Sequence, residues 1–303
     1  MTHLRPLSVI GVPSSAGAYG PGQERAPSAF REYGLLDRLT SAGVEVVDRG
    51  DSSVVVWSKD DANPTAGNAE LVARVAAGLA DRAAAALAEN HDLLVLGGDC
   101  TVELGTVAGA IRDGSQVGLA YIDLDADLNT PLTGDGILDW MGVAHLLDID
   151  GAHDGVAGVG SRRPMLEPWH VRLLAVANIT PAEQEVIDRL DVVVESLDAF
   201  EHDPDAVLAR TGEWALGLDR LLVHVDIDVL DYDAFPIAEN TDSRGGLSLD
   251  ELGALLDKLC RLPSFRALTL TEVNPEHAPD QAAAFEQLIT MLTTALSSRA
   301  GSP

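Results

Sequence analysis

Short runs of apolar residues alternate along this chain with longer stretches in which apolar residues recur at helical spacing. The short runs predict eight strands, at residues 7–10, 44–47, 93–96, 117–122, 156–159, 192–195, 221–225 and 267–271. The longer stretches, such as residues 68–89 and 249–261, predict amphipathic helices between the strands. Strands that are apolar on both faces and separated by helices are typical of a parallel sheet covered by helices on both sides. We therefore expect an α/β fold.

Three segments rich in glycine, proline and aspartate predict loops above this sheet, at residues 14–27, 130–136 and 231–246. In open α/β sheets, ligands bind at the carboxyl ends of the strands. The chain has no internal repeat and no long linker, and its 303 residues suffice for one large core. We expect a single domain over residues 1–303.

Composition narrows the choice of partners and of compartment. No apolar run approaches the ~20 residues of a membrane helix, so we expect no membrane partner. The formal charge of −28 argues against a nucleic-acid partner, because phosphates would be repelled. Two cysteines, Cys100 and Cys260, are too few for a disulfide framework. Together with an N-terminus that lacks a signal-peptide core, they favour a cytoplasmic protein.

Four of the predicted strands end in side chains that can bind metal ions. These candidates are Asp99, Cys100, Asp123, Asp125, Asp127, His224, Asp226, Asp228 and Glu272. Residues two apart in an extended segment point to a common side. The side chains of residues 123, 125 and 127 therefore face one side, and so do those of residues 224, 226 and 228. Converging carboxylates repel one another unless cations are bound. Oxygen ligands suit Mn²⁺, Mg²⁺ or Ca²⁺, and a thiolate or an imidazole shifts the preference toward Mn²⁺, Co²⁺ or Zn²⁺.

A structural role is the alternative for each of these acids. A single aspartate at the end of a strand can cap a helix or orient a loop, and Asp99, which precedes a predicted helix, is open to that interpretation. Two separate Asp-x-Asp units on buried strands favour metal binding instead. Cys260 lies in an Ala/Leu-rich predicted helix and is interpreted as a core residue.

Several motifs resemble, in order and in spacing, those of the ureohydrolases, the arginase and agmatinase family of binuclear manganese hydrolases. Residues 9–13 (VIGVP), 20–22 (GPG) and 26–27 (AP) are similar to the opening of the family. Residues 97–99 (GGD), 123–131, 226–231 and 272–275 (EVNP) match its metal and substrate motifs. The resemblance covers nearly the whole chain.

The resemblance implies a three-layer α/β/α sandwich with a central, mainly parallel eight-stranded sheet. It implies two Mn²⁺ ions per chain and hydrolysis of the C–N bond of a guanidino or amidino compound by a metal-activated hydroxide. The small-molecule substrate is then a guanidino or amidino compound. The family also forms trimers or hexamers, so the resemblance implies a homo-oligomer.

Family roles carry over to the residues that agree. Asp123 and Asp226 match the positions that bridge the two metals. Asp127 matches a ligand of the first metal and Asp228 a ligand of the second. Glu272 matches the acid that holds the guanidinium group of the substrate.

Two further matches concern the substrate rather than the metals. Asn129 matches a residue that contacts the substrate α-carboxylate in arginases. Thr133 is a second candidate for that contact, in a loop whose length differs from the family pattern.

Five positions depart from the family pattern. Cys100 and Asp125 each replace a histidine ligand, and His224 stands where a serine or threonine is usual. Asp139 aligns with the histidine that shuttles protons in arginases. Thr180 aligns with an acid that often recognises the substrate α-amino group, so that acid is absent.

The departures make the site more negative than the family pattern. Cys100 as a thiolate and five aspartates give a formal −6, whereas four aspartates give −4. Metal can bind with one ligand protonated, nearby cations can compensate, or one metal can be missing. His224 can act as a neutral ligand, protonate to offset charge, or be hydrogen-bonded in the core.

Three other residues carry two interpretations each. Cys100 can be a metal ligand, which its family position favours, or a nucleophile activated by a histidine. His145, in a predicted helix after the 130–136 loop, can be a substitute proton shuttle or a packed, hydrogen-bonded histidine. Asp139 can relay protons or be a solvated loop acid.

These observations give two hypotheses of function. A more anionic site makes bound metals weaker Lewis acids, so the first is a hydrolase of a non-standard guanidine or amidine, such as a modified arginine. Its catalytic set is Glu272, Asp125, Asp139 and His145. The alternative is a non-catalytic or regulatory relative that binds a guanidino ligand or an active paralogue.

Overall fold

A computed structural model describes residues 4–242 and 244–299. Within this part, eight strands form one sheet in the order β2-β1-β3-β8-β7-β4-β5-β6, and every pairing is parallel. The strands are β1 (Leu7–Gly11), β2 (Val46–Asp51), β3 (Asp92–Leu96), β4 (Val117–Ile122), β5 (Val171–Val176), β6 (Val193–Ser196), β7 (Arg220–Asp226) and β8 (Phe265–Thr271).

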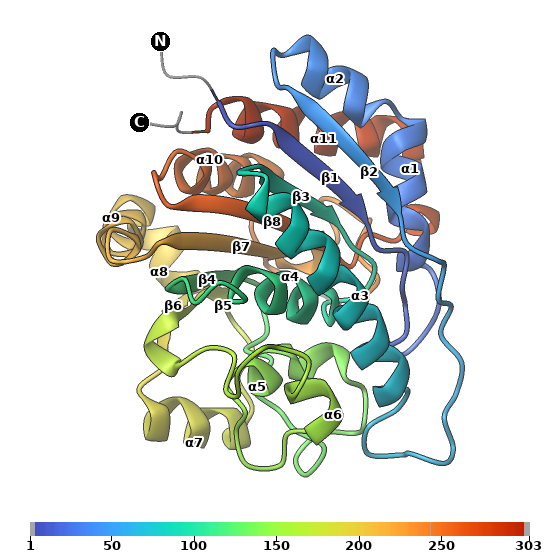
Figure 1. The fold of residues 1–303 in the computed structure, drawn as a ribbon, viewed down its shortest axis with the longest axis vertical. Coiled ribbons are helices and arrows are strands. Elements are labelled where there is room, and N and C mark those ends of the chain that lie inside the picture. Colours follow the sequence, from blue (N-terminus) through green and yellow to red (C-terminus); the bar gives the residue numbers. More distant parts are fainter. Residues whose placement is uncertain (1–3, 243, 300–303) are drawn as a thin grey trace.

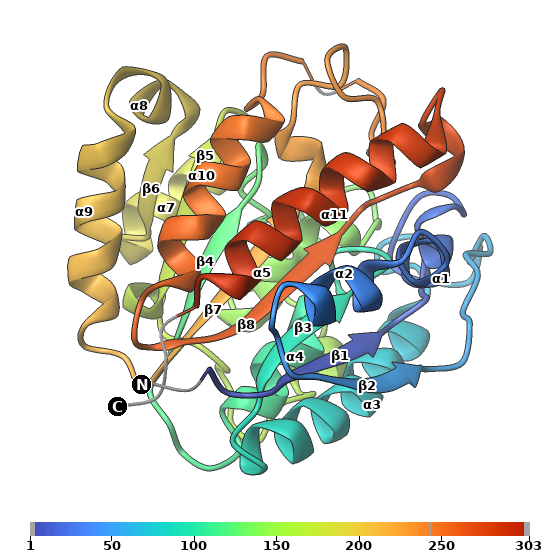
Figure 2. The same cartoon turned by 90° about the horizontal axis from the view of Figure 1, so that it is seen from above.

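Helices cover both faces of this sheet (Figure 1). One layer comprises α1 (Ala26–Glu32), α2 (Leu35–Ser41), α8 (Leu197–His202), α9 (Pro204–Ala215), α10 (Leu249–Cys260) and α11 (Gln281–Ser297). The other comprises α3 (Ala69–Ala88), α4 (Val102–Ala110), α5 (Gly142–Leu146), α6 (Asp154–Ala157) and α7 (Pro181–Leu190). Seen from above, α10 and α11 lie across the sheet (Figure 2). The predicted three-layer α/β/α fold is confirmed.

Short 3-10 helices occupy several of the connections. They are η1 (Gln23–Arg25), η2 (Asp139–Met141), η3 (Pro168–His170), η4 (Ile227–Val229) and η5 (Pro275–His277). Among the described residues, no helix has both the length and the apolarity that a membrane span needs.

The period of two along each strand divides the core between the two layers. In β3, Leu94 faces the core that contains α10 and α11, whereas Leu93 and Val95 face the core that contains α3 and α4. All three side chains are fully buried. Because both faces of a central strand are covered in this way, its sequence reads as an unbroken apolar run.

The strand predicted at residues 156–159 is wrong. That run begins within α6, and the strand in this part of the chain is β5. An apolar run of four residues fits a helical turn as well as a strand, so periodicity could not separate the two. In β5 the apolar run is interrupted by Arg172, whose guanidinium lies 3.5 Å from a carboxylate oxygen of Glu195 on β6.

The other predicted strands are present, with shifts at their ends. The strand predicted at residues 44–47 begins two residues later as β2, and the one predicted at 192–195 is β6, Val193–Ser196. The helices predicted at residues 68–89 and 249–261 correspond to α3 and α10.

Strands β3, β8, β7 and β4 are consecutive neighbours in the middle of the sheet. These four strands are the ones followed by the candidate metal ligands. In register, Ile122 of β4 pairs with Val225 of β7, and Asp226 of β7 pairs with Thr271 of β8. The strands therefore end at a similar level, and the residues that follow them gather above the centre of the sheet.

Candidate metal centre

A pocket of about 40 Å³ lies above the carboxyl ends of the central strands. Seven of its lining residues are acidic: Asp123, Asp125, Asp127, Asp139, Asp226, Asp228 and Glu272. The others are Tyr19, Trp140 and Asn240. No lysine or arginine is among the described residues that line it. The pocket therefore concentrates acidic side chains, with no basic side chain among its described lining residues.

The chain after β4 supplies three of these acids. Asp123 Oδ1 accepts a hydrogen bond from the backbone N–H of Asp125 at 2.8 Å. Asp125 also forms an isolated parallel bridge with Asn178. Asp127 has a φ of 53°, in the left-handed region, and its Oδ2 accepts a hydrogen bond from the hydroxyl of Tyr121. A non-glycine residue held there is under local strain, which is common at functional sites.

The chain after β7 supplies two more. Asp226 Oδ1 accepts from the backbone N–H of Asp228 at 2.8 Å, the same local geometry as at Asp123 and Asp125. Asp228 Oδ2 accepts from Asn240 Nδ2 at 3.0 Å. Asn240 belongs to the predicted 231–246 loop, so that loop contributes to the site.

The segments after β3 and β8 meet at one backbone amide. The N–H of Cys100 points at Asp139 Oδ1, 2.7 Å away, and at Glu272 Oε1, 3.0 Å away. Glu272 also has a positive φ, 60°, and its Oε2 accepts from Gln23 Nε2 at 3.0 Å. Asp139 is buried at the start of η2, so it is not a solvated loop acid.

The described residues contain three groups of potential metal ligands. Within each group, the ligand atoms all lie within 4.8 Å of one another. The groups are Cys100 with Asp123 and Asp226, Asp123 with Asp125 and Asp228, and Cys100 with Asp139 and Glu272. The first two groups share Asp123, and the first and third share Cys100, so the groups adjoin one another. A donor set rich in carboxylate oxygens, with one sulfur, fits two divalent ions of the Mn²⁺ type.

Burial and mutual repulsion raise the pKa of these carboxyl groups. Burial is the main cause for Asp123, Asp226 and Glu272, whose pKa values lie well above the usual range, and neighbouring carboxylates add to it. The pKa of Asp125 is raised to about 7, by burial and then by Asp228. Without cations the pocket therefore favours protonated acids, and bound cations would reverse that preference.

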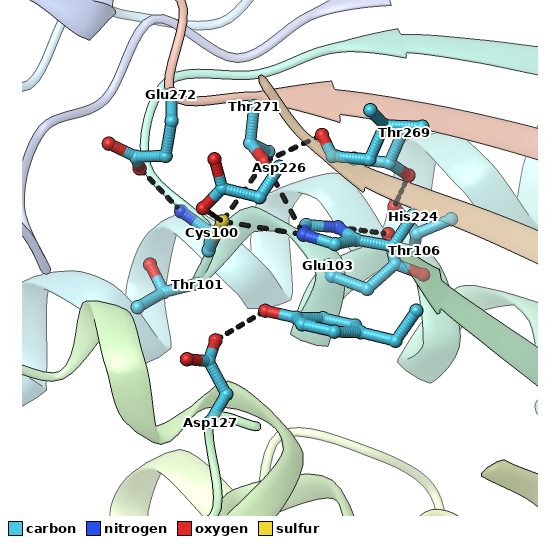
Figure 3. A network of polar contacts seen from close by, with 12 residues as sticks. Cys100, Thr101, Glu103, Thr106, Asp127, His224, Asp226, Thr269, Thr271 and Glu272 are labelled. Atoms are coloured by element: carbon cyan, nitrogen blue, oxygen red, sulfur yellow. Dashed lines mark hydrogen bonds and ion pairs between the residues drawn. The ribbon is translucent and has the colours of Figure 1, made fainter. Parts of the chain in front are cut away.

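The sulfur of Cys100 lies against Asp226, one of the lining residues of the pocket (Figure 3). Its thiol donates to Asp226 Oδ2 at 3.0 Å, and Thr271 Oγ1 lies 3.0 Å from the sulfur. His224 Nε2 approaches it to 3.3 Å. Burial and then Asp226 raise the pKa of the thiol well above its usual range. The metal-free site therefore holds a protonated thiol, which disfavours its role as an unassisted nucleophile.

Two residues predicted from the family pattern lie outside the pocket lining. Asn129 and the exposed Thr133 contact each other, Thr133 Oγ1 donating to Asn129 Oδ1 at 3.2 Å. Thr133 Oγ1 also accepts from the backbone N–H of Thr130 at 2.9 Å. Both side chains thus take part in the local structure of the loop.

His145 is a packed histidine in α5. Its Nδ1 lies 2.7 Å from the carbonyl oxygen of Met141, and its Nε2 accepts from the backbone N–H of His153 at 3.0 Å. Burial lowers its pKa to about 4. Both ring nitrogens are therefore occupied by backbone groups, and the ring is not part of the pocket lining.

Asp99 orders the loop before α4. Its Oδ1 accepts from the backbone N–H of Thr101 at 3.1 Å, and its Oδ2 accepts from the backbone N–H of Gly17 at 3.0 Å. It belongs to none of the three ligand groups among the described residues. Its position agrees with the structural interpretation, close to that of a helix cap.

Comparison with known proteins identifies the family to which the chain belongs. The profile of the Arginase family matches residues 5–295. The chain belongs to the arginase family. Human mitochondrial arginase-2 is 30% identical to this arginase-family protein over 281 residues, which cover 91% of this chain and 79% of that protein.

Solved structures agree with this arginase-family fold. An arginase from Bacillus caldovelox superposes with a TM-score of 0.86 at 23% identity, covering 97% of this chain and 98% of that one. A formimidoylglutamase from Bacillus subtilis superposes with a TM-score of 0.70 at 18% identity, covering 97% and 87% of the two chains. Arginase-family relatives are hydrolases that act on amidino compounds.

Sequence reasoning missed several residues of the arginase-family site. Tyr19, in the loop after β1, and Trp140, in η2, line the pocket with ring centroids 6.2 Å apart. Tyr121 was placed in a predicted strand, and its position two residues before Asp123 was a usable signal, because it shares that residue's side of the strand. Glu103, in the first turn of α4, gave no signal, because its partner His224 is distant in the sequence.

Proposed function

We propose that this protein is a metal-dependent hydrolase of the C–N bond of a guanidino or amidino compound, with two Mn²⁺ ions per chain. The observation that supports it is the pair of ligand groups that share Asp123, in a pocket with seven acidic residues on its walls. The family membership supports the same class of reaction.

The residues present fit the two ions. Asp123 belongs to two of the ligand groups, with Cys100 and Asp226 in one and Asp125 and Asp228 in the other. Asp127 lines the same pocket and completes the donor set. When bound, the ions lower the pKa of water, which makes it a nucleophile near neutral pH.

The protein side chains then bind and orient the substrate. Glu272 presents a carboxylate, anchored by Gln23 Nε2 and the Cys100 N–H, that can accept N–H bonds from a guanidinium or amidinium group. Asp139 lies beside Glu272 and accepts a hydrogen bond from the same backbone N–H of Cys100. In the hydrolysis a water oxygen adds to the central carbon and the C–N bond breaks. Asp139 is the acid placed to pass a proton to the leaving amine.

The walls of the pocket indicate what the substrate carries. An acidic lining without lysine or arginine selects a cationic reactive end. Tyr19 and Trp140 add aromatic faces, against which a planar cation can stack. Asn129 and Thr133, the residues expected to hold an α-carboxylate, bond to each other instead. The more anionic ligand set would make bound metals weaker Lewis acids, so we propose a non-standard guanidine or amidine, such as a modified arginine, in preference to plain arginine.

The test combines metal analysis with a substrate panel. The protein is loaded with Mn²⁺, freed of excess metal, and assayed with arginine, agmatine, guanidinobutyrate, formiminoglutamate and hydroxyarginine. Two equivalents of bound metal with turnover of a compound other than arginine support the proposal. Efficient hydrolysis of plain arginine contradicts the substrate claim. Absence of both metal and turnover supports the non-catalytic relative.

We also propose a homo-oligomer of three or six chains, as the family resemblance implies, and a cytoplasmic location, which the low cysteine content favours. One chain has a mass of 31.9 kDa, so the measured mass of the assembly divided by this value gives the number of chains. Light scattering at micromolar concentration measures the assembly directly. A mass of one chain contradicts the oligomer.

A further inference from the structure

A line of three buried polar side chains runs beneath the pocket (Figure 3). Glu103 Oε2 lies 3.6 Å from His224 Nδ1, and His224 Nε2 lies 3.3 Å from Cys100 Sγ. Glu103 and Cys100 are 2% exposed and His224 is fully buried. The imidazole therefore connects an acid on α4 to the sulfur of Cys100, a proposed metal ligand.

The orientation of the imidazole is fixed by its neighbours. Tyr121 of β4 and His224 of β7 are paired in register, and their rings stack with centroids 4.1 Å apart and planes 9° apart. The hydroxyl of Tyr121 donates to Asp127. Thr271 Oγ1 lies 3.4 Å from His224 Nε2 and donates to the Val225 carbonyl oxygen at 3.1 Å. The stacked ring therefore cannot turn without disturbing two neighbouring strands.

Three buried polar atoms of Glu103 and His224 form no hydrogen bond in the part of the chain that the structure describes. Both carboxyl oxygens of Glu103 and His224 Nδ1 lack a hydrogen-bond partner among the described residues. Buried polar groups are almost always hydrogen-bonded, and these atoms face one another at 3.6 Å. A shift of a few tenths of an ångström closes the contact.

We propose that His224 and Glu103 are positioning residues that hold the Cys100 sulfur toward a metal ion. This inference rests on the proposed function, in which Cys100 is a ligand. A sulfur that binds a cation no longer donates its hydrogen and instead accepts hydrogen bonds. His224 Nε2 is the nitrogen placed to donate one, while Glu103 holds the opposite edge of the ring.

This arrangement gives His224 a role other than metal ligand. His224 contacts the sulfur through Nε2, and it belongs to none of the three ligand groups found among the described residues. Groups that orient a ligand from behind commonly change metal affinity about 10- to 100-fold when they are removed. The same range is expected here for loss of the imidazole N–H.

Cobalt substitution tests the inference independently of turnover. Co²⁺ bound to a thiolate shows a charge-transfer absorption band in the near ultraviolet, so the band reports directly on Cys100. His224→Phe keeps the ring and its stacking on Tyr121 but removes the N–H. Glu103→Leu removes the contact with Nδ1, and Glu103→Gln keeps a group that can hydrogen-bond to it.

The inference predicts a graded result. His224→Phe weakens the band and lowers Co²⁺ affinity about 10- to 100-fold. Glu103→Leu acts in the same direction, whereas Glu103→Gln stays near the unmodified protein. Cys260→Ala, which removes the only other cysteine, leaves the band unchanged. Thermal unfolding of each variant verifies that it is folded. If His224→Phe does not fold, the comparison of Glu103→Leu with Glu103→Gln still tests the inference.

Two outcomes overturn the inference in distinguishable ways. If the band and the Co²⁺ affinity are unchanged in both His224→Phe and Glu103→Leu, the positioning role is ruled out. If Cys100→Ser loses the band in the same experiment, Cys100 is still a metal ligand. No band in the unmodified protein, with two equivalents of Co²⁺ bound, shows that the sulfur is not a ligand. The positioning role then falls, and the carboxylate-based function remains.

Discussion

The Cys100 sulfur lies 3.3 Å from His224 Nε2, although 124 positions separate the two residues along the chain. Both positions depart from the family pattern that the sequence resembles. By that resemblance, a small side chain stands at position 100 where a large one is usual, and a large one stands at position 224 where a small one is usual. The contact shows that the two departures share one volume beneath the pocket, so they are expected to be energetically coupled.

Restoring a histidine at position 100 should therefore depend on position 224. Cys100→His alone places a second ring in space that His224 fills, and overpacking of this kind costs about 1–3 kcal/mol of unfolding free energy. Cys100→His combined with His224→Ser should recover much of that loss. Urea unfolding of both single variants, the double variant and the unmodified protein measures the coupling.

The control for this cycle is Cys100→His combined with Cys260→Ala. Cys260 lies in α10 in the opposite core layer, so its effect should simply add to that of Cys100→His. Free energies for positions 100 and 224 that add within about 0.5 kcal/mol would contradict the shared volume.

Metal stoichiometry should separate a shared ligand from an unshared one. Asp123 belongs to two ligand groups and Asp125 to one. Asp123→Asn should weaken binding of both ions, whereas Asp125→Asn should reduce the bound Mn²⁺ from about two equivalents to about one. Inductively coupled plasma mass spectrometry of protein freed of excess metal gives both values. Two full equivalents in Asp123→Asn would argue against a shared ligand.

Glu272→Gln should impair the reaction while leaving metal in place. The change removes the negative charge proposed to hold the substrate cation but keeps an acceptor for the Cys100 N–H. We expect kcat/KM to fall about 100- to 1000-fold, with Mn²⁺ content unchanged. Glu213→Gln on the exposed face of α9 is the matched control and should leave activity unaffected. A change of less than threefold in Glu272→Gln would exclude the charge from the mechanism.

The metal-free protein should lose stability as pH rises. An acid whose pKa is higher in the folded state binds its proton more tightly there, so its stabilising effect is present at low pH and disappears as pH rises through the folded pKa. For Asp125 that window runs from about 4 in the unfolded chain to about 7. The pKa values of Asp123 and Asp226 are also raised, mainly by burial, so both residues act in the same direction.

Thermal unfolding in EDTA at pH 5.5 and 8.5 measures this effect. Surface acids whose pKa is lowered, such as Asp113 at about 2, are ionised throughout this range and do not mask it. Saturating Mn²⁺ should remove or reverse the trend, because metal ions compete with protons for the same oxygens. A metal-free protein that is more stable at pH 8.5 would contradict the raised pKa values.

Much of the site could be located from the sequence because its residues follow buried strands directly. Asp123 and Asp226 each lie at the carboxyl end of an apolar run, and all parallel strands end at the same edge of a sheet. The same local reasoning failed at residues 156–159, where a short apolar run is compatible with either kind of element. The family resemblance, not local periodicity, suggested Asn129 as a substrate contact, and that assignment stays a prediction.

By itself, the sequence determined the alternation of strands and helices, the parallel sheet, and an acidic site at its carboxyl edge, because these follow from local periodicity and the cost of isolated buried charge. Only the tertiary structure decided that β3, β8, β7 and β4 are neighbours and that Glu103, His224 and Cys100 form one line beneath the pocket. Contacts between residues more than a hundred positions apart depend on strand order and register, which no local pattern encodes.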